Sequence, residues 1–414
     1  EMLRSLVGSE MCIRDSNMIL LIIIPVYISL NLYILHRVHK WLTACSERFH
    51  SGKFAVPYIV IYSMLALSLL FAFLLPSSEL QVLVKRISNY WLGTFAYILI
   101  FIAVADILRL VLKKIPGKIH DFFFSKVGYV SVGILLTALI GGISAYGIVH
   151  SNIVKVKPYE VTIRKNCGDN RNLKVVLVAD LHLGYSVGNG QMQRMVKKIN
   201  DQNADLVVFA GDIFDNEYEA VQNPDRIAKT LAGIKSRYGS FGVFGNHDVT
   251  ERLLGGFSVA SQAKEMRDPR FDEFAKKAKI RILDDEVMLI DDAFYLVGRK
   301  DAQKPGDGTK NRMEPEVILS GLDKAKPIIV LEHQPKQLEE LERAGADMQL
   351  CGHTHDGQMF PGNLTVKLMW ENACGYLKKG NLHSIVTSGV GVWGPAMRVG
   401  TDCEICPITI HFQG

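Results

Sequence analysis

The sequence predicts an α/β domain that follows a helical transmembrane region. Long apolar runs are confined to the first 150 of the 414 residues, and the later residues alternate short buried-strand patterns with helix patterns. Several of those strand patterns end in Asp, Asn or His, the residue types of a ligand-binding edge. We therefore divide the chain into a transmembrane region over 17–150 and a soluble domain over 151–414.

Residues 1–16 are left out of this prediction. They begin without Met, have no useful periodicity, and end in Met-Cys-Ile-Arg-Asp-Ser, which resembles translated sequencing-adapter contamination. We expect a non-native leader here, with Met18 close to the natural start.

Four apolar runs are long enough to cross a bilayer as helices, which takes about 20 residues each. They cover residues 18–35, 55–75, 91–112 and 127–149. The first could also be an uncleaved signal anchor. Asp106 and Arg109 lie one helical turn apart in the third run, where a self-paired helix end is a simpler interpretation than a transport path.

The Lys and Arg residues of the loops predict an orientation. The loop after the first run holds Arg37, Lys40, Arg48 and Lys53, the loop after the third holds Lys113, Lys114, Lys118 and Lys126, and the loop between them holds Lys85 and Arg86. The positive-inside rule then places the soluble domain outside the cytoplasm. About eight residues follow the last run, and their extended length of roughly 25–30 Å keeps the domain near the bilayer. The small net charge of +5 does not indicate nucleic-acid binding.

Five buried-strand patterns carry the chemistry of the soluble domain, with a helix pattern over residues 190–200 between the first two. The segments that follow the five strands are Asp180-Leu181-His182, Gly211-Asp212-Ile213-Phe214-Asp215, Gly245-Asn246-His247-Asp248, Glu332-His333 and Cys351-Gly352-His353-Thr354-His355. Since ligands bind at the carboxyl ends of strands, we expect them all to converge on one edge of the sheet. Glycines at the strand exits leave room for sharp turns.

This set of residues suits hydrolysis of a phosphate ester or anhydride. Such a substrate is anionic and repels hydroxide, so the reaction needs cations on the phosphoryl oxygens and a water with a lowered pKa. Two metals about 3.5–4 Å apart supply both, held by N and O ligands that include a bridging carboxylate. The strand ends offer enough such ligands.

In the order D-x-H, G-D-x-x-D, G-N-H-D, H and G-H-x-H, the motifs resemble those of the calcineurin-like metallophosphoesterase superfamily. The resemblance covers residues 155–414 and implies a four-layer α/β/β/α sandwich with two divalent metal ions, which could be Mn, Fe, Zn or Co. It implies that the first metal is held by Asp180, His182 and His355 and the second by Asn246, His333 and His353. It also implies that Asp212 bridges the two metals and that His247 donates a proton to the leaving oxygen. The segment after His355 and the tail from Ser388 are similar to membrane-associated bacterial phosphoesterases, one relative of which splits UDP-diacylglucosamine.

The sequence thus predicts a dinuclear phosphohydrolase of the bacterial cytoplasmic membrane with an extracytoplasmic catalytic domain. A phosphodiesterase or a pyrophosphatase is expected ahead of a monoesterase, with manganese among the candidate metals. A lipid-linked or envelope phosphate is the expected substrate, and the bilayer is the expected partner. The rival is a non-catalytic membrane protein whose metal-bearing domain binds a phosphorylated partner. The presence of both Asp212 and His247 favours the enzyme, and the lack of sequence repeats disfavours a transporter. The sequence predicts no oligomeric state.

Six further residues leave alternatives open. Asp215 and Asp248 are expected to support the ligands or cap a helix rather than bind metal. Arg398 could bind substrate phosphate or form a surface ion pair. Cys403 and Cys406 could form half a zinc site, a redox pair or a disulfide, with a structural role favoured. A further acidic residue, Asp356, could tune metal preference or face solvent.

Overall fold

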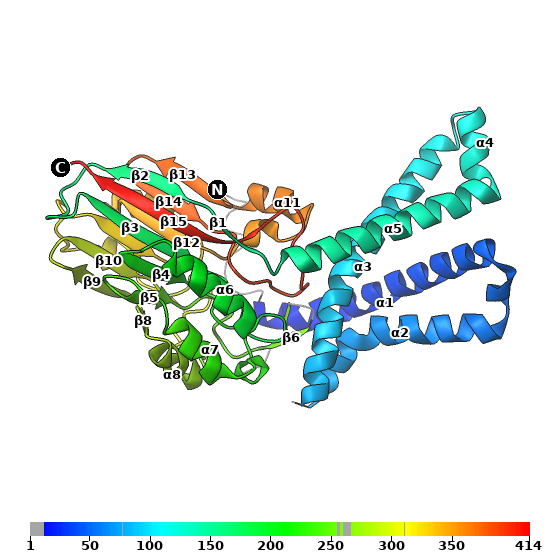
Figure 1. The fold of residues 1–414 in the computed structure, drawn as a ribbon, viewed down its shortest axis with the longest axis horizontal. Coiled ribbons are helices and arrows are strands. Elements are labelled where there is room, and N and C mark those ends of the chain that lie inside the picture. The colour runs from blue at the N-terminus through cyan, green and yellow to red at the C-terminus, as the bar shows by residue number, and fades with distance from the viewer. Residues whose placement is uncertain (1–11, 77, 255–256, 260–265, 310) are drawn as a thin grey trace. The chain divides into compact units, whose positions relative to one another are not determined.

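The computed structural model describes residues 12–76, 78–254, 257–259, 266–309 and 311–414, which form two compact units (Figure 1). We call Glu1–Gly147, Arg252–Ser261 and Gly394–Ala396 the helical unit, and the remainder of the chain the sheet unit. Of the predicted leader, residues 1–11 lie outside the described residues, and α1 begins within the rest.

The helical unit contains α1 (Cys12–Cys45), α2 (Gly52–Leu74), α3 (Glu79–Leu112), α4 (Lys118–Phe124) and α5 (Lys126–His150), with the hairpin β6 (Arg252–Leu254) and β7 (Phe257–Val259). Among the described residues, α2, α3 and α5 are long and apolar enough to cross a membrane. The first predicted run falls in α1, which is not one of these three. The structure therefore supports the predicted transmembrane helices in α2, α3 and α5, and a fourth one in α1 stays a prediction.

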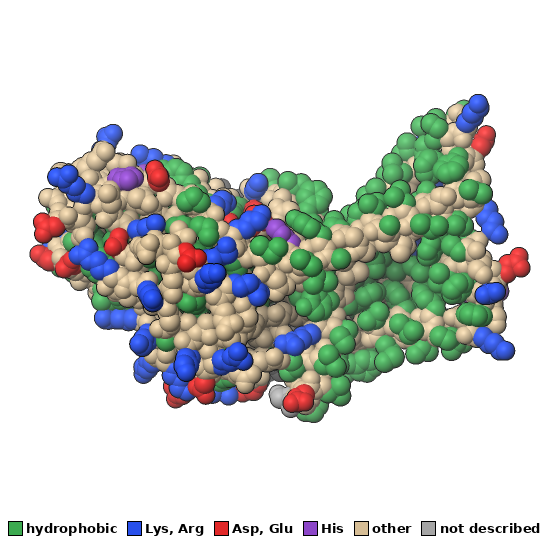
Figure 2. Space-filling model, in the orientation of Figure 1, with side chains coloured by type: hydrophobic (Ala, Val, Ile, Leu, Met, Phe, Trp, Pro, Cys, Tyr) green, Lys and Arg blue, Asp and Glu red, His purple; other side chains and the backbone are tan. Residues whose placement is uncertain are grey.

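Aromatic packing joins the first three helices of this unit. Trp91 packs with Phe95 and Ile34, and its indole nitrogen donates a hydrogen bond of 3.1 Å to the hydroxyl of Tyr27. Apolar side chains cover most of the outer surface of these helices, as Figure 2 shows and as expected of surfaces in contact with lipid. The unit thus has a small internal core and an apolar exterior.

The predicted self-pairing of Asp106 is wrong. Its carboxylate pairs with Arg37 of α1, with 2.7 Å between Nη2 and Oδ1, and accepts a hydrogen bond from Tyr33. Arg109 instead lies over the ring of Phe124, 5.1 Å from its centroid. Pairing between helices depends on their packing, which a spacing of three residues within one helix does not reveal.

The sheet unit is built on two sheets. The larger runs in the order β1-β15-β3-β4-β5-β8, with β2 also on β15, and the smaller runs β13-β14-β12-β11-β10-β9. The strands of the larger sheet are β1 (Val154–Val156), β2 (Tyr159–Ile163), β3 (Asn172–Val178), β4 (Leu206–Ala210), β5 (Ser240–Val243), β8 (Ile280–Ile282) and β15 (Cys403–Phe412). Those of the smaller sheet are β9 (Glu286–Ile290), β10 (Phe294–Gly298), β11 (Ile328–Leu331), β12 (Met348–Cys351), β13 (Gly375–Lys379) and β14 (Leu382–Val386).

One hydrophobic core lies between the two sheets. Leu177 of β3 and Val208 of β4 belong to the same buried cluster as Leu331 of β11 and Leu350 of β12. A second cluster packs α9 (Pro315–Ile318) and α10 (Leu338–Arg343) on the outer face of the smaller sheet. The helices α6 (Asn189–Asn200), α7 (Pro224–Leu231) and α8 (Pro269–Lys277) flank the larger sheet (Figure 1). The α/β class predicted for this half is confirmed.

The expectation that all five strand ends lie on one edge of one sheet is wrong. Strands β3, β4 and β5 belong to the larger sheet, whereas β11 and β12 belong to the smaller one. The carboxyl ends of the five strands still meet, because the two sheets share their core and the strands within each set are parallel. A fully apolar strand pattern carries no signal for which sheet it joins.

Candidate metal centre

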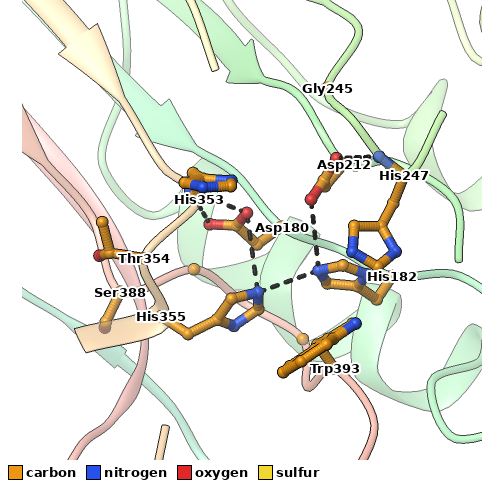
Figure 3. A network of polar contacts seen from close by, with 12 residues as sticks. Asp180, His182, Asp212, Gly245, His247, His353, Thr354, His355, Ser388 and Trp393 are labelled. Atoms are coloured by element: carbon orange, nitrogen blue, oxygen red, sulfur yellow. Dashed lines mark hydrogen bonds and ion pairs between the residues drawn. The ribbon is translucent and has the colours of Figure 1, made fainter. Parts of the chain in front are cut away.

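The first predicted ligand group is close together and buried. Asp180 and His182 follow β3, and His355 lies in the short 3₁₀ helix η4 (His355–Gly357) after β12. The Nε2 atoms of His182 and His355 are 2.9 Å apart, and His355 Nε2 is 3.8 Å from Asp180 Oδ1 (Figure 3). One ligand atom from each of the three lies within 4.8 Å of the others, so the three could hold one ion.

The second group lies beside it. Asp212, His333 and His353 also bring one ligand atom each within 4.8 Å of one another. His333 Nε2 is 3.1 Å from Asp212 Oδ2, 3.1 Å from His353 Nδ1 and 3.0 Å from Asn246 Oδ1. These four residues are the ones predicted to surround the second metal, with Asp212 shared.

A single carboxylate oxygen reaches toward both groups. Asp212 Oδ2 is 3.7 Å from His182 Nε2 and 3.1 Å from His333 Nε2. The other oxygen accepts the backbone N–H of His247 at 2.8 Å, which fixes the carboxylate (Figure 3). This placement is what a bridging ligand requires.

The backbone at the strand ends is held in left-handed conformations. Positive φ angles occur at Asp180 (53°), His182 (44°), Asp212 (50°), His353 (77°) and His355 (52°). For residues other than glycine such angles are uncommon and cost on the order of 1–3 kcal/mol each, and they cluster at functional sites. The surrounding contacts therefore hold these side chains in a geometry that an isolated strand end would not adopt.

Glycines make that geometry possible through close packing. A Cβ at Gly245 would lie 2.2 Å from Asp212 Oδ1, and a Cβ at Gly352 would lie 2.5 Å from Asp180 Oδ2. Gly211 combines a φ of 80° with a would-be Cβ only 2.7 Å from His333 Nδ1. The predicted role of these three glycines is thus a matter of close approach to the ligands as much as of turn geometry.

Asp215 lies between two imidazole rings. Its Oδ1 is 3.5 Å from Nδ1 of His182 and 3.5 Å from Nδ1 of His247. These are ion-pair distances rather than close hydrogen bonds. A third group that could hold a cation is formed by His182, Asp215 and His247. Because His182 already belongs to the first group, we assign Asp215 the orienting role that the sequence favoured.

Two other open alternatives, those for Asp248 and Arg398, have clear outcomes. Asp248 accepts backbone N–H groups from Gly245 (2.7 Å) and Phe214 (2.8 Å), so it fixes the loops that carry ligands. Arg398 is fully buried and donates to the carbonyl oxygens of His355 and Ser388, at 2.8 and 2.6 Å, so neither the phosphate nor the surface-pair interpretation fits. Nothing in the sequence around Arg398 signalled that its guanidinium would brace backbone carbonyl groups.

The two cysteines of the last strand are buried and free, and they serve as packing residues. Cys403 donates from Sγ to the carbonyl oxygen of Ser151 at 3.1 Å, and Cys406 Sγ lies 3.6 Å from Glu404 Oε1. Among the described residues neither belongs to a metal-capable group, and neither does Asp356.

Comparison with known proteins agrees with this geometry. Residues 173–357 match the calcineurin-like phosphoesterase family. These residues form a calcineurin-like phosphoesterase domain. The matched range runs from β3 to η4 and so contains every predicted ligand of both groups.

The relatives of the phosphoesterase domain include a transmembrane protein and a pyrophosphatase by name. The chain is 30% identical over 67% of its length to a transmembrane protein with metallophosphoesterase domain of Danio rerio, of which it covers 62%. It is 26% identical to an uncharacterized metallophosphoesterase of Campylobacter jejuni, over 93% of this chain and 95% of that one. It is also 22% identical, over 58% of its length, to the UDP-2,3-diacylglucosamine pyrophosphatase of Chlamydia trachomatis, of which it covers 84%.

The electrostatics of the phosphoesterase domain suit bound cations. Burial raises the pKa of Asp180 to about 6, and Asp212 adds to that effect. Burial lowers the pKa of His353 and of His355 well below the ordinary value, so both imidazoles are neutral, which is the form that binds a metal. Burial would lower the pKa of His182 and of His333, but the neighbouring carboxylates outweigh it and raise both values, that of His333 to about 10. The buried carboxylates therefore attract positive charge, which divalent cations would supply.

Three residues that the sequence prediction missed surround the centre. The ring of Trp393 is 6.0 Å from that of His247, and the ring of Trp370 is 5.2 Å from that of His353. Lys336 places its ammonium 5.6 Å from the centroid of Trp370. Of the three, Lys336 lies three residues after the predicted ligand His333, which could have drawn attention to it in the sequence.

Proposed function

We propose that the chain is a membrane-anchored phosphohydrolase that uses two divalent metal ions to cleave phosphodiester or pyrophosphate bonds. The observation that carries this proposal is the position of Asp212, whose one carboxylate lies between the two ligand groups. Two separate structural metal sites would not need a shared carboxylate. The common core of the two sheets also supports the four-layer sandwich expected for such an enzyme.

In this proposal the ligands divide as the sequence predicts. Asp180, His182 and His355 hold the first ion, and Asp212 contributes to both ions. The second ion is held by Asn246, His333 and His353. Mixed N and O donors bind Mn, Fe, Zn or Co, so the identity of the ions depends on supply as well as on the site.

The bound ions would neutralise the phosphoryl oxygens and lower the pKa of a water from about 15.7 to near 7. The chain's own residues do the rest. His247 gives a proton to the leaving oxygen, which would otherwise depart as an unstable anion. Asp215, 3.5 Å from Nδ1 of that ring, keeps its other nitrogen directed toward the substrate. The backbone N–H of His247 holds Asp212 in its shared position.

A bilayer-borne substrate fits the covalent layout of the chain. Helix α5 ends at His150 and β1 begins at Val154, so a span of three residues links an apolar helix to the catalytic domain. The relative named UDP-2,3-diacylglucosamine pyrophosphatase acts on a lipid-linked pyrophosphate, which supports a substrate of that class here. We place the domain on the extracytoplasmic side of a bacterial cytoplasmic membrane, because the loops rich in Lys and Arg belong on the cytoplasmic side.

Hydrolysis by the purified full chain tests the proposal. The substrates are p-nitrophenyl phosphate and bis-p-nitrophenyl phosphate, assayed after removal of metal and after loading with Mn, Fe, Zn or Co. We expect metal-dependent turnover, faster on the diester, that is lost in Asp212→Asn and kept in Asp225→Asn, which changes an exposed carboxylate paired with Lys277. Equal activity of the Asp212→Asn variant would refute the shared-carboxylate mechanism.

A further inference from the structure

Helix α11 (Gly362–Met369) exposes most of its apolar side chains. No residue of the helix is buried, and the exposed fractions of Leu364, Leu368 and Met369 are 53%, 88% and 75%. Phe360, just before the helix, is 49% exposed. Figure 2 shows hydrophobic atoms gathered over this segment. A helix on a water-facing surface normally turns such residues inward, so a contiguous exposed set indicates an interaction site.

The helix is joined directly to the metal centre. It follows η4, which contains the predicted ligand His355, and it ends at Met369, directly before Trp370, whose ring is 5.2 Å from the ring of His353. Lys336 lies over the same indole. Anything that binds α11 is therefore held next to the ligands of both metal groups.

The segment that leads into α11 is also connected by hydrogen bonds to the C-terminal end of α5. His150, the last residue of α5, lies 2.7 Å from Asp402 through Nε2 and Oδ1. Thr401, the residue before Asp402, donates a hydrogen bond of 2.7 Å from its hydroxyl to the carbonyl oxygen of Gln358. Phe360 then donates its backbone N–H to Val399 at 2.8 Å. A short chain of contacts thus connects the end of an apolar, membrane-length helix to the base of α11.

From this juxtaposition we propose that α11 is a second membrane contact, which inserts Leu364, Leu368 and Met369 into the interfacial region of the bilayer that holds the helical unit. Lys367, exposed on the same helix, reaches the lipid phosphates as these apolar neighbours enter the acyl boundary. The contact delivers a phosphoester carried on a lipid to the metal centre along Trp370 and Lys336. This second step rests on the proposed hydrolase function.

The occupant is a lipid surface rather than a soluble protein because of where α11 lies. The covalent link through α5 holds the sheet unit within a few residues of the bilayer, so the apolar side chains at that end meet lipid at a high local concentration. A protein partner would have to compete with lipid for the same site.

Site-specific fluorescence in the full chain tests the contact. An environment-sensitive nitrobenzoxadiazole label is placed at Leu368→Cys, Leu364→Cys or, as a control, Val317→Cys, which is 61% exposed on α9. All three variants carry Cys45→Ser to remove an exposed thiol, and the protein with that change alone measures background labelling. The proteins are reconstituted in vesicles of phosphatidylcholine and phosphatidylglycerol that contain doxyl-labelled lipid.

We expect strong quenching by doxyl lipid at residues 364 and 368, at least about threefold greater than at residue 317, together with a blue shift of the emission. Quenching at both α11 positions equal to that at residue 317 would overturn the membrane contact. This result does not depend on whether the protein hydrolyses any ester.

Turnover tests the delivery step. The probes are the p-nitrophenyl ester of phosphatidic acid in vesicles and water-soluble bis-p-nitrophenyl phosphate. We expect the double change Leu368→Ser, Met369→Ser to lower the ratio of lipid to soluble turnover about tenfold, and Val317→Ser to leave the ratio as in the parent. An unchanged ratio in the double variant would overturn delivery. Hydrolysis of neither probe by the metal-loaded parent would instead refute the proposed function, while the quenching result would still decide the membrane contact.

Discussion

Replacing Gly245 by alanine should disable the metal centre through one methyl group. The new Cβ would lie 2.2 Å from Asp212 Oδ1, and 2.7 Å from both Asp212 N and His333 Cγ. A carbon and an oxygen in van der Waals contact are about 3.4 Å apart, so the carboxylate or the loop must move by roughly 1.2 Å. Displacements near 1 Å in a catalytic group can cost about 10²-fold in rate. We therefore expect Gly245→Ala to lower kcat/KM for bis-p-nitrophenyl phosphate by about 100-fold or more.

The assay pairs this rate with the metal content and the thermal unfolding temperature of the purified chain. Gly190→Ala is the matched control, because its Cβ would lie 3.6 Å from Arg194 Nη1, an ordinary contact, in the first turn of α6. A Gly245→Ala protein that binds two ions and keeps the parental rate would refute the argument that the carboxylate's position depends on this glycine. A loss of activity in the Gly190→Ala control would show that the assay responds to any glycine change.

Three further perturbations test other parts of the structure. Asp215→Asn removes the charge between two imidazole rings and should lower turnover by about 10- to 100-fold at saturating metal, whereas parental kinetics would exclude an orienting role. Glu332→Leu leaves the buried guanidinium groups of Arg299 and Arg312 without the carboxylate that pairs with them at 2.9 and 2.6 Å, and it should cost about 3–5 kcal/mol, or roughly 6–20 °C in Tm. The exposed Arg281→Ala should cost less than about 1 kcal/mol, and similar Tm values for the two variants would contradict this. Partial burial would raise the pKa of Asp402, but hydrogen bonds from a lysine and a histidine outweigh it and lower that pKa. The ionised form therefore stabilises the fold above the unfolded pKa of about 3.9, and the Tm deficit of Asp402→Asn at pH 7 should shrink as the pH falls below about 4.

The predicted ligands lie close together in the structure, while their division into metal ligands stays a prediction. Each of them, such as Asp180 or His353, lies within four residues of the end of a strand, and a strand followed by polar residues is a local pattern that one sequence displays. The partition of the five strands between two sheets was not visible, because it depends on which buried faces meet in the shared core. For the same reason the pairing of Asp106 with Arg37, across two helices, was missed.

Residues that act at a distance were the hardest to predict. Arg398 donates a hydrogen bond to the carbonyl oxygen of His355, which lies 43 residues earlier in the sequence. Trp370 and His353 are brought together by the segment that contains α11. Neither residue has a local spacing that signals its role. The sequence analysis made no prediction for the apolar residues of α11, whose exposure is seen only in the structure.

The position of β15 has a consequence for how the protein is made. Its residues pair with β1 and β2 along one edge and with β3 along the other, yet it is synthesised after every other strand of the sheet. Until it arrives, β3 presents an unpaired apolar edge to the nascent chain's surroundings, and such edges invite association with other chains. The larger sheet can therefore be completed only after residue 412 has been synthesised.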